Sequence, residues 1–270
     1  MNTQPTPVGG GDISAAWRLA TAGGDVFVKT GPPSAADMFA AEADGLAELA
    51  AAGAVRVPEV IAAGHSDTLV FLALEWLSFE NAGTDTQRQF GEQLARMHRV
   101  TKRRFGWHRN NTIGLTPQNN EWDDDWISFF REHRLGFQIQ LALRNGFARE
   151  LQDSGEQLLK RLPIYFEQTE TEPSLLHGDL WGGNWACCNG APVIFDPAVY
   201  YGDRETDIAM TRLFGGFGKA FYDAYEESWP PQPGHLERQK LYQLYHVLNH
   251  LNLFGSAYLG RARGLIDELL

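Results

Sequence analysis

The stretch 174–207 contains the polar spacing that most constrains this chain of 270 residues. A short apolar run precedes His177, Asp179 comes two positions later, Asn184 follows Asp179 by five positions, and Asp196 follows Asn184 by twelve. Asp and Asn are common in turns, so three ordinary loop residues remain one interpretation. Because these polar residues follow apolar, strand-like runs, we favour a site in which loops at the strand ends bring their side chains together.

The segment between Asn184 and Asp196 is predicted to form a β-hairpin. Two apolar runs, 185–188 and 192–195, are separated by Asn-Gly at 189–190. Asn-Gly between apolar runs is a strong hairpin signal. A hairpin would bring its two ends together, and with them Asn184 and Asp196.

The separations of Asp179, Asn184 and Asp196 are similar to those of protein kinases. In kinases the first Asp accepts the proton of a substrate hydroxyl, while the Asn and the later Asp hold Mg²⁺. This hard cation prefers oxygen ligands. The pattern therefore predicts a phosphotransferase with Asp179 as the base and Asn184 and Asp196 as metal ligands.

Composition limits the class of partner. The chain is 43% hydrophobic and 21% charged with a net charge of −11, which indicates a globular protein and argues against nucleic acid or an acidic membrane surface as a partner. Cys187 and Cys188 are adjacent in one predicted strand and would point to opposite faces, so we expect reduced thiols and a cytoplasmic location. Neither a signal peptide nor a membrane-spanning run is evident.

The N-terminal segment contains a candidate nucleotide-binding apparatus. Gly9, Gly10 and Gly11 lie between strand-like runs, where their backbone N–H groups could approach phosphates; a flexible hinge is the alternative. Lys29 closes the predicted strand 26–29, much like the phosphate-binding lysine of protein kinases. A solvated strand-end lysine is the more common case.

A helix predicted at 35–52 supplies a partner for Lys29. Glu42 falls among its inward apolar positions, where an unpaired carboxylate is costly. We therefore expect Lys29 and Glu42 to form an ion pair. Two further strands are predicted at 55–63 and 68–74.

The chain is expected to cross to a second lobe after these strands. In a bilobal kinase this is where the backbone meets adenine, which makes Glu75, Trp76 and Leu77 the candidates, with the boundary near Ser78. The predicted fold class is α+β, a bilobal protein-kinase-like fold. Its β-rich N-terminal lobe would span 1–77 and its larger helical lobe 78–270.

The second lobe supplies further candidates. His98 shares the apolar face of a helix predicted at 86–100, which favours a core role over a catalytic one. The loop 105–114 contains His108 followed by Arg and Asn. That Asn cannot act as a base, and no strand pair with a second Asp follows it, so this loop is not the catalytic loop and is kept as a candidate substrate loop. A helix at 122–144 is predicted to begin with three aspartates in its first turn. Asp207, one turn into a later helix, could accept the N–H groups of the catalytic loop.

Several segments resemble the fructosamine-3-kinase, or ketosamine kinase, family, which is related to aminoglycoside and choline kinases. The most specific are LLHGDLWGGNWA and VIFDPAVYYGDRETDIAMTRLFGGF, and the resemblance extends to VFVKT, MFAAEADGL, FGWHRNNTIG, WDDDWISFFREHRL and LYQLYHVLNHLNLFG. It covers nearly the whole chain.

The resemblance implies ATP-dependent phosphorylation of the 3-hydroxyl of an Amadori sugar on an amine, a deglycating repair activity. It assigns Asp179 as base, Asn184 and Asp196 to Mg²⁺, Lys29 to phosphate and Glu42 to orienting that lysine. The Gly9–Gly11 run would cover the phosphates, and His177 and Asp207 would support the catalytic loop.

The chain departs from this family at two positions. Asp12 stands where many members have a cysteine, so thiol regulation there is not expected, and Asn110 stands where many bacterial members have an acidic residue. Trp181 is either a core residue or a platform for the sugar and its protonated amine, and His108 is a second substrate candidate. Alternatives are a kinase for aminoglycosides, choline or a similar alcohol, and a nucleotide-binding pseudokinase.

Overall fold

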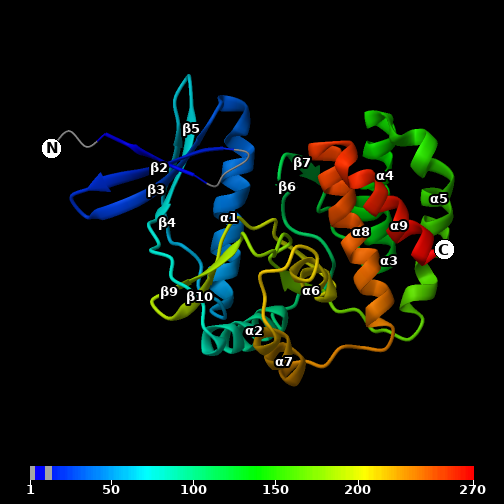
Figure 1. Cartoon of the computed structure of the whole chain (residues 1–270). Helices are drawn as coiled ribbons and strands as arrows, with labels where there is room; N and C mark the ends of the chain where they lie inside the picture. The colour runs from blue at the N-terminus through cyan, green and yellow to red at the C-terminus, as the bar shows by residue number, and fades with distance from the viewer. Residues whose placement is uncertain (1–3, 10–13) are drawn as a thin grey trace.

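The computed structural model describes residues 4–9 and 14–270, which fold into a β-rich N-terminal part and a helical C-terminal part (Figure 1). The N-terminal part is one antiparallel sheet in the order β1-β2-β3-β5-β4, with one long helix against it. Its elements are β1 (Thr6–Val8), β2 (Ala15–Thr21), β3 (Gly24–Gly31), α1 (Ala36–Ala52), β4 (Val60–His65) and β5 (Val70–Glu75). We call this five-stranded sheet the N-terminal sheet.

The C-terminal part packs helices around three small antiparallel strand pairs, β6-β7, β8-β11 and β9-β10. Its helices are α2 (Thr84–His98), α3 (Trp126–Phe130), α4 (Gly136–Ala142), α5 (Ala148–Arg161), α6 (Glu205–Thr211), α7 (Lys219–Ser228), α8 (His235–Phe254) and α9 (Leu259–Leu269). Its strands are β6 (Asn111–Ile113), β7 (Thr116–Gln118), β8 (Ser174–Leu176), β9 (Trp185–Cys188), β10 (Ala191–Ile194) and β11 (Tyr200–Gly202). No helix among the described residues is both long and apolar enough to cross a membrane.

Each part has its own apolar core. The smaller core joins α1 to the N-terminal sheet through Phe39, Leu46, Val70, Leu72 and Leu74. The larger core fills the space among the helices of the C-terminal part. The lobe boundary predicted between residues 77 and 78 falls in the segment from the end of β5 to the start of α2, and it stays a prediction.

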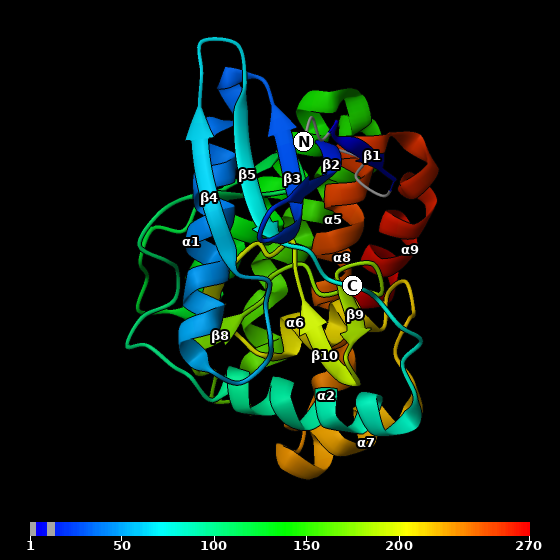
Figure 2. The same ribbon diagram turned by 90° about the vertical axis from the view of Figure 1, so that its left-hand side faces the viewer.

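The β9-β10 hairpin lies below the N-terminal sheet and beside α2 (Figure 2). Its register pairs Trp185 with Ile194, and its turn contains Asn189 and Gly190, both with positive φ. The predicted hairpin is therefore confirmed, because its turn uses residues that tolerate this backbone conformation.

Two predicted elements begin later than expected. β4 starts at Val60 instead of residue 55, and Pro58, which cannot donate a ladder hydrogen bond, lies in the segment before it. The helix predicted from residue 122 starts at Trp126, because Asp125 caps it by accepting a 2.6 Å hydrogen bond from the N–H of Ser128. The aspartates 123–125 therefore precede the helix instead of occupying its first turn.

A buried histidine on α8 should make folding sensitive to acid. His246 is buried, and neither ring nitrogen has a hydrogen-bond partner among the described residues. Burial, assisted by the nearby His250, lowers the pKa of His246 to about 3 against the opposing effect of Asp207. In the unfolded chain this ring takes up a proton near pH 6.5. The unfolded state therefore binds more protons between about pH 6.5 and 3, and stability falls as the pH falls.

We expect His246→Met to reduce the loss of unfolding free energy between pH 7 and pH 5 by about 2 kcal/mol, the linkage free energy of one such group. Urea unfolding at both pH values measures this difference. His65→Met, at the exposed end of β4, is the matched control and should leave the pH dependence unchanged. The same acid sensitivity in His246→Met and the parent chain would contradict the prediction.

Candidate active site

The loop after β8 has a backbone conformation that requires glycine at position 178. Gly178 has a φ of +83°, and a Cβ atom there would lie 2.1 Å from the carbonyl oxygen of Ala198. His177 is buried; its Nδ1 accepts a hydrogen bond from the N–H of Asp179 at 3.2 Å, so its Nε2–H donates to the Phe195 carbonyl at 2.9 Å. Burial lowers the pKa of His177, which keeps this ring neutral. The histidine and glycine thus fix the direction in which Asp179 leaves the loop.

Asp207 holds the backbone of this loop through hydrogen bonds. Its two carboxylate oxygens accept hydrogen bonds from the N–H groups of His177 at 2.8 Å and Gly178 at 2.9 Å. This confirms the contact predicted from its place one turn into α6. Although burial by itself raises the pKa of Asp207, the hydrogen bond from His98 and the other contacts lower it below the ordinary value.

His98 orients Asp207 from α2. Its Nε2 lies 3.2 Å from Asp207 Oδ2 and its Nδ1 lies 2.7 Å from the hydroxyl of Tyr225. The ring is buried, and burial lowers its pKa, so it is neutral and donates to the carboxylate. The core location predicted for His98 is confirmed. The position of His98 on its helix did not indicate that Asp207 would be its partner, because Asp207 lies more than 100 residues away in the sequence.

The hairpin brings the three polar residues of the central motif into one region. Asn184 Nδ2 donates to Asp179 Oδ2 at 3.2 Å and to the Asp179 carbonyl at 2.8 Å. The N–H of Phe195 donates to the Asn184 carbonyl at 3.0 Å, which places Asp196 next to that end of the hairpin. Asp196 has a φ of +55°, a conformation that Asp adopts more readily than most residues.

Lys29 connects the two parts of the molecule at this point. Its Nζ lies 2.7 Å from Glu42 Oε1 and 2.5 Å from Asp196 Oδ1, so β3, α1 and the end of the hairpin meet at one ammonium group. The predicted Lys29–Glu42 ion pair is confirmed. Burial by itself lowers the pKa of Lys29, but the two carboxylates outweigh it and raise the pKa above its usual range. The lysine is therefore held as a cation.

Asp179 has the proton affinity of a group that can accept a proton near neutral pH. Burial, together with the negative charge of Asp196, raises the pKa of Asp179 to about 7 against the opposing hydrogen bond from Asn184. A carboxylate with a pKa near the working pH is suited to general-base chemistry.

The other predicted nucleotide-binding residues lie next to the N-terminal sheet or at its end. Gly9 follows β1 at the start of the connection to β2, whereas Gly10 and Gly11 lie outside the described residues. The carboxylate of Glu75 pairs with Arg56 at 2.5 Å, so its side chain is directed to a protein partner. Trp76 packs under the guanidinium of Arg18, and Leu77 follows it.

The two predicted substrate residues differ in their surroundings. Trp181 is 40% exposed, its ring crosses over Gly183, and its edge meets the ring of Phe214 at a centroid distance of 6.2 Å. Its accessible face excludes the core interpretation. His108 is exposed beside Trp107, in a loop whose next residue, Arg109, contacts α1. No contact among the described residues joins His108 to Asp179.

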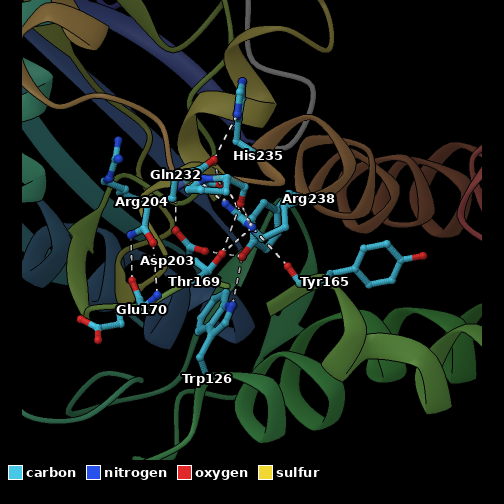
Figure 3. Close-up of polar contacts among 12 residues, drawn as sticks. Trp126, Tyr165, Thr169, Glu170, Asp203, Arg204, Gln232, His235 and Arg238 are labelled. Atoms are coloured by element: carbon cyan, nitrogen blue, oxygen red, sulfur yellow. Dashed lines mark hydrogen bonds and ion pairs between the residues drawn. The ribbon is translucent and has the colours of Figure 1, made fainter. Parts of the chain in front are cut away.

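The start of α6, which carries Asp207, is anchored by a buried polar network. Arg238 on α8 donates two hydrogen bonds to the carboxylate of Glu205, at 2.8 and 2.9 Å, and the hydroxyl of Tyr242 donates to Asp203 at 2.5 Å. Figure 3 shows Asp203 and Arg238 in this network, whereas the Arg204 side chain is directed away from Arg238 and donates to the Trp229 and Pro230 carbonyls. Motif reasoning missed Arg238 and Tyr242, because they lie on a helix distant from the motif in the sequence.

A polar cavity of about 430 Å³ lies beside this network and contains none of the predicted site residues. It is lined by Gln168, Glu170, Glu172, Ser174, Asp203, Arg204, Trp229 and Gln232.

The donor set at the hairpin ends suits a magnesium ion that shares its ligands with phosphate. Asn184 uses its amide nitrogen for Asp179, which leaves its amide oxygen available, and the Asp196 side chain is 47% exposed. Within residues 4–9 and 14–270, no three His, Cys, Asp or Glu side chains form a metal-binding group. One amide and one carboxylate fit Mg²⁺, which usually keeps waters and binds one or two carboxylates plus substrate phosphates.

Sequence comparisons agree over the whole chain. The sequence profile described as Fructosamine kinase matches residues 1–270. A probable ketoamine kinase of Synechocystis sp. is 44% identical over 265 residues, covering 97% of this chain and 89% of the relative. The chloroplastic protein-ribulosamine 3-kinase of Arabidopsis thaliana is 42% identical over 267 residues, covering 97% and 81%.

Structural comparisons place the fold in the same group. A crystal structure assigned as a fructosamine-3-kinase, from Haemophilus somnus, superposes with a TM-score of 0.92 at 32% identity, covering 99% of this chain and 91% of the other. The aminoglycoside phosphotransferase APH(4)-Ia gives a TM-score of 0.69 at 15% identity, covering 98% and 92%, and so shares the fold. The predicted bilobal, protein-kinase-like α+β fold is therefore confirmed, and the chain belongs to the fructosamine kinase family.

Proposed function

We propose that this protein transfers the γ-phosphoryl group of ATP to the 3-hydroxyl of a ketosamine. The observation that carries the proposal is the meeting of Lys29 with Glu42 and Asp196 beside Asp179 and Asn184, in a chain that the Fructosamine kinase profile matches from end to end. The resulting 3-phosphate tends to eliminate and to release the amine, so the activity would deglycate amines or proteins.

Asp179 is the proposed general base. Its carboxylate accepts the proton of the acceptor hydroxyl as that oxygen bonds to phosphorus and the bond to the leaving ADP oxygen breaks. Phosphoryl transfer passes through a loose transition state, so most of the catalysis is positioning and charge stabilisation. Lys29, oriented by Glu42, would contact the phosphates, and the backbone of Gly9, Gly10 and Gly11 would cover them.

Asn184 and Asp196 would hold Mg²⁺ through one amide oxygen and one carboxylate. When bound, the ion would neutralise negative charge on the phosphates. His177 and Asp207 would keep the catalytic loop in place without touching the substrate. Backbone groups at Glu75, Trp76 and Leu77 would meet the adenine. We further propose a cytoplasmic location, which rests on the sequence.

A kinase for aminoglycosides is the second candidate, because APH(4)-Ia shares the fold. At 15% identity that likeness concerns the fold alone, whereas the ketoamine and ribulosamine kinases are above 40% identical. A pseudokinase is disfavoured because Lys29, Asp179 and Asp196 are all present and arranged together.

The deciding experiment follows ADP release with fructosyl-lysine, ribulosyl-lysine, kanamycin and choline as acceptors, and locates the phosphate by NMR. We expect turnover with a ketosamine and phosphate at the 3-position. Turnover only with kanamycin or choline, or phosphate at another hydroxyl, would overturn the proposal, and ATP binding without any turnover would support the pseudokinase.

Trp181→Ala is expected to raise KM for the ketosamine more than KM for ATP. The exposed indole can pack on the sugar and stabilise a protonated amine, an interaction of about 0.5–2 kcal/mol, which corresponds to roughly 2- to 30-fold in KM. Steady-state kinetics with each substrate varied in turn measures both constants. Trp181→Phe should retain part of the affinity, and a larger effect on KM for ATP would assign the indole to the nucleotide side.

A further inference from the structure

Arg109 connects the C-terminal part of the molecule to α1. Its Nη1 lies 2.5 Å from Asp44 Oδ2, and its Nη2 lies 2.5 Å from Asp37 Oδ1 and 3.4 Å from the Asp37 carbonyl. Figure 1 shows α1 between the N-terminal sheet and the segment that leads to β6, to which Arg109 belongs. A planar guanidinium is suited to this arrangement because its fork of N–H groups can serve two carboxylates together.

Asp37 and Asp44 lie on a different face of α1 from Glu42. Asp37 and Asp44 are seven residues apart, two helical turns, and therefore share a face. Glu42 is two positions before Asp44, and residues two apart do not share a face. The helix is thus held by Arg109 on one side and by Lys29 on another.

Hydrogen bonds hold the backbone of Arg109 and of its loop in place. Asn120 Nδ2 donates to the Arg109 carbonyl at 3.1 Å, and the N–H of Asn120 donates to Asn110 Oδ1 at 2.9 Å. The buried Arg134 in turn donates to Asn120 Oδ1 at 2.5 Å. Asn110 therefore makes a structural contact within the loop. Because Arg109 is held on this loop, its contacts with Asp37 and Asp44 fix the position of α1 relative to the C-terminal part.

A second group of contacts holds only the C-terminal half of α1. The hydroxyl of Tyr201 donates to Glu48 Oε1 at 2.5 Å, and a Cβ at Gly45 would lie 3.2 Å from Val199. Both contacts lie after Glu42 in the helix. Phe39 packs the half of α1 that contains Glu42 on the N-terminal sheet. Without Arg109 this half would still be held by the sheet and by Lys29, but it would lose the connection to the C-terminal part through Asp37 and Asp44.

We propose that Arg109 is a positioning residue that keeps α1 in the place where Glu42 orients Lys29. This inference rests on the proposed role of Lys29 in binding the nucleotide phosphates. Arg109 touches neither nucleotide nor acceptor in this proposal. It acts through Asp37 and Asp44, and its loss should therefore weaken nucleotide binding more than it lowers the chemical rate.

The test compares Arg109→Ala and Arg109→Lys with the parent chain. Affinity for AMP-PNP with Mg²⁺ is measured by calorimetry, and KM for ATP and kcat are measured with the best ketosamine. We expect Arg109→Ala to raise the Kd of AMP-PNP and the KM for ATP by about 5- to 30-fold, the lower part of the usual range of a coupling between two sites, with a smaller change in kcat. Arg109→Lys should lie between the two, because an ammonium group lacks the rigid fork that serves both carboxylates.

Arg104→Ala is the matched control. Arg104 directly precedes the loop 105–114 that contains Arg109 and pairs with Asp124 at 2.9 Å, and among the described residues it makes no hydrogen bond or ion pair with α1. Its removal should leave the Kd of AMP-PNP within about twofold, because the Arg104–Asp124 pair does not include α1. An equal loss of affinity in Arg104→Ala would show general loosening of the loop and overturn the inference.

The double variant Asp37→Asn/Asp44→Asn tests the contact from the other side. It should reproduce the loss seen in Arg109→Ala, and adding Arg109→Ala to it should change the affinity little further, because contacting residues are not additive. Unchanged AMP-PNP affinity in both variants would overturn the positioning role. The binding measurement does not depend on the acceptor, so a chain that is inactive on ketosamines would contradict the proposed function and still test this inference.

Discussion

Asp179→Asn is expected to lower kcat by about 10²–10⁴-fold while the affinity for ATP stays nearly unchanged, because that is the usual contribution of a general base. Asparagine has almost the same shape as aspartate but cannot accept the hydroxyl proton. Burial and the charge of Asp196 raise the pKa of Asp179 to about 7, so the carboxylate can bind a proton near neutral pH. Its hydrogen bond from Asn184 should survive through the remaining amide oxygen.

Single-turnover kinetics with a ketosamine and calorimetry with AMP-PNP separate the chemical step from nucleotide binding. Asp153→Asn, the same substitution at an exposed position of α5, is the control and should be indistinguishable from the parent. A kcat above about a tenth of the parent value would be too large for the loss of a general base and would remove Asp179 from that role.

Asp196→Ala is expected to abolish Mg²⁺-dependent turnover. The substitution removes the carboxylate proposed to hold the ion and one of the two partners of Lys29. Lys29 keeps its 2.7 Å contact with Glu42, so the fold around the lysine should persist. We therefore expect a folded protein whose turnover is lost, measured as ADP release over a range of Mg²⁺ concentrations.

The backbone at Asp196 requires a second variant as a control. Its φ of +55° is tolerated by Asn better than by Ala. Asp196→Asn therefore removes the charge without adding backbone strain, and it should be nearly as inactive as Asp196→Ala. Full recovery of either variant in excess Mg²⁺ and ATP would show that Asp196 is not a primary ligand.

The local elements of the site could be predicted because their signals are local. The Asn-Gly turn determines the β9-β10 hairpin, and the hairpin determines that Asn184 and Asp196 lie at adjacent ends. The Lys29–Glu42 pair also follows from local patterns. A lysine ends a strand and a carboxylate occupies an inward position on the next helix, where burial without a partner would be costly.

Element boundaries were less predictable, because short-range competition decides them. Asp125 uses its side chain to cap α3, so the acidic run lies before the helix. Pro58 lies in the segment before β4, which begins later than predicted. The helix predicted through residue 144 is also divided by two π-helical turns, 131–135 and 143–147. Hydrophobic periodicity alone does not distinguish these turns from a continuous helix.

The sequence by itself therefore determined the fold class and the residues at the centre of the site, because the spacing of Asp179, Asn184 and Asp196 is a short-range property of one stretch. Only the tertiary structure decided what holds that centre in place. His98 on α2 reaches Asp207 on α6, and Arg109 reaches α1, across sequence separations of 109 and 65–72 residues. These partners are determined by the packing of whole elements, and no local sequence pattern shows which carboxylate a buried histidine or a partly buried arginine will contact.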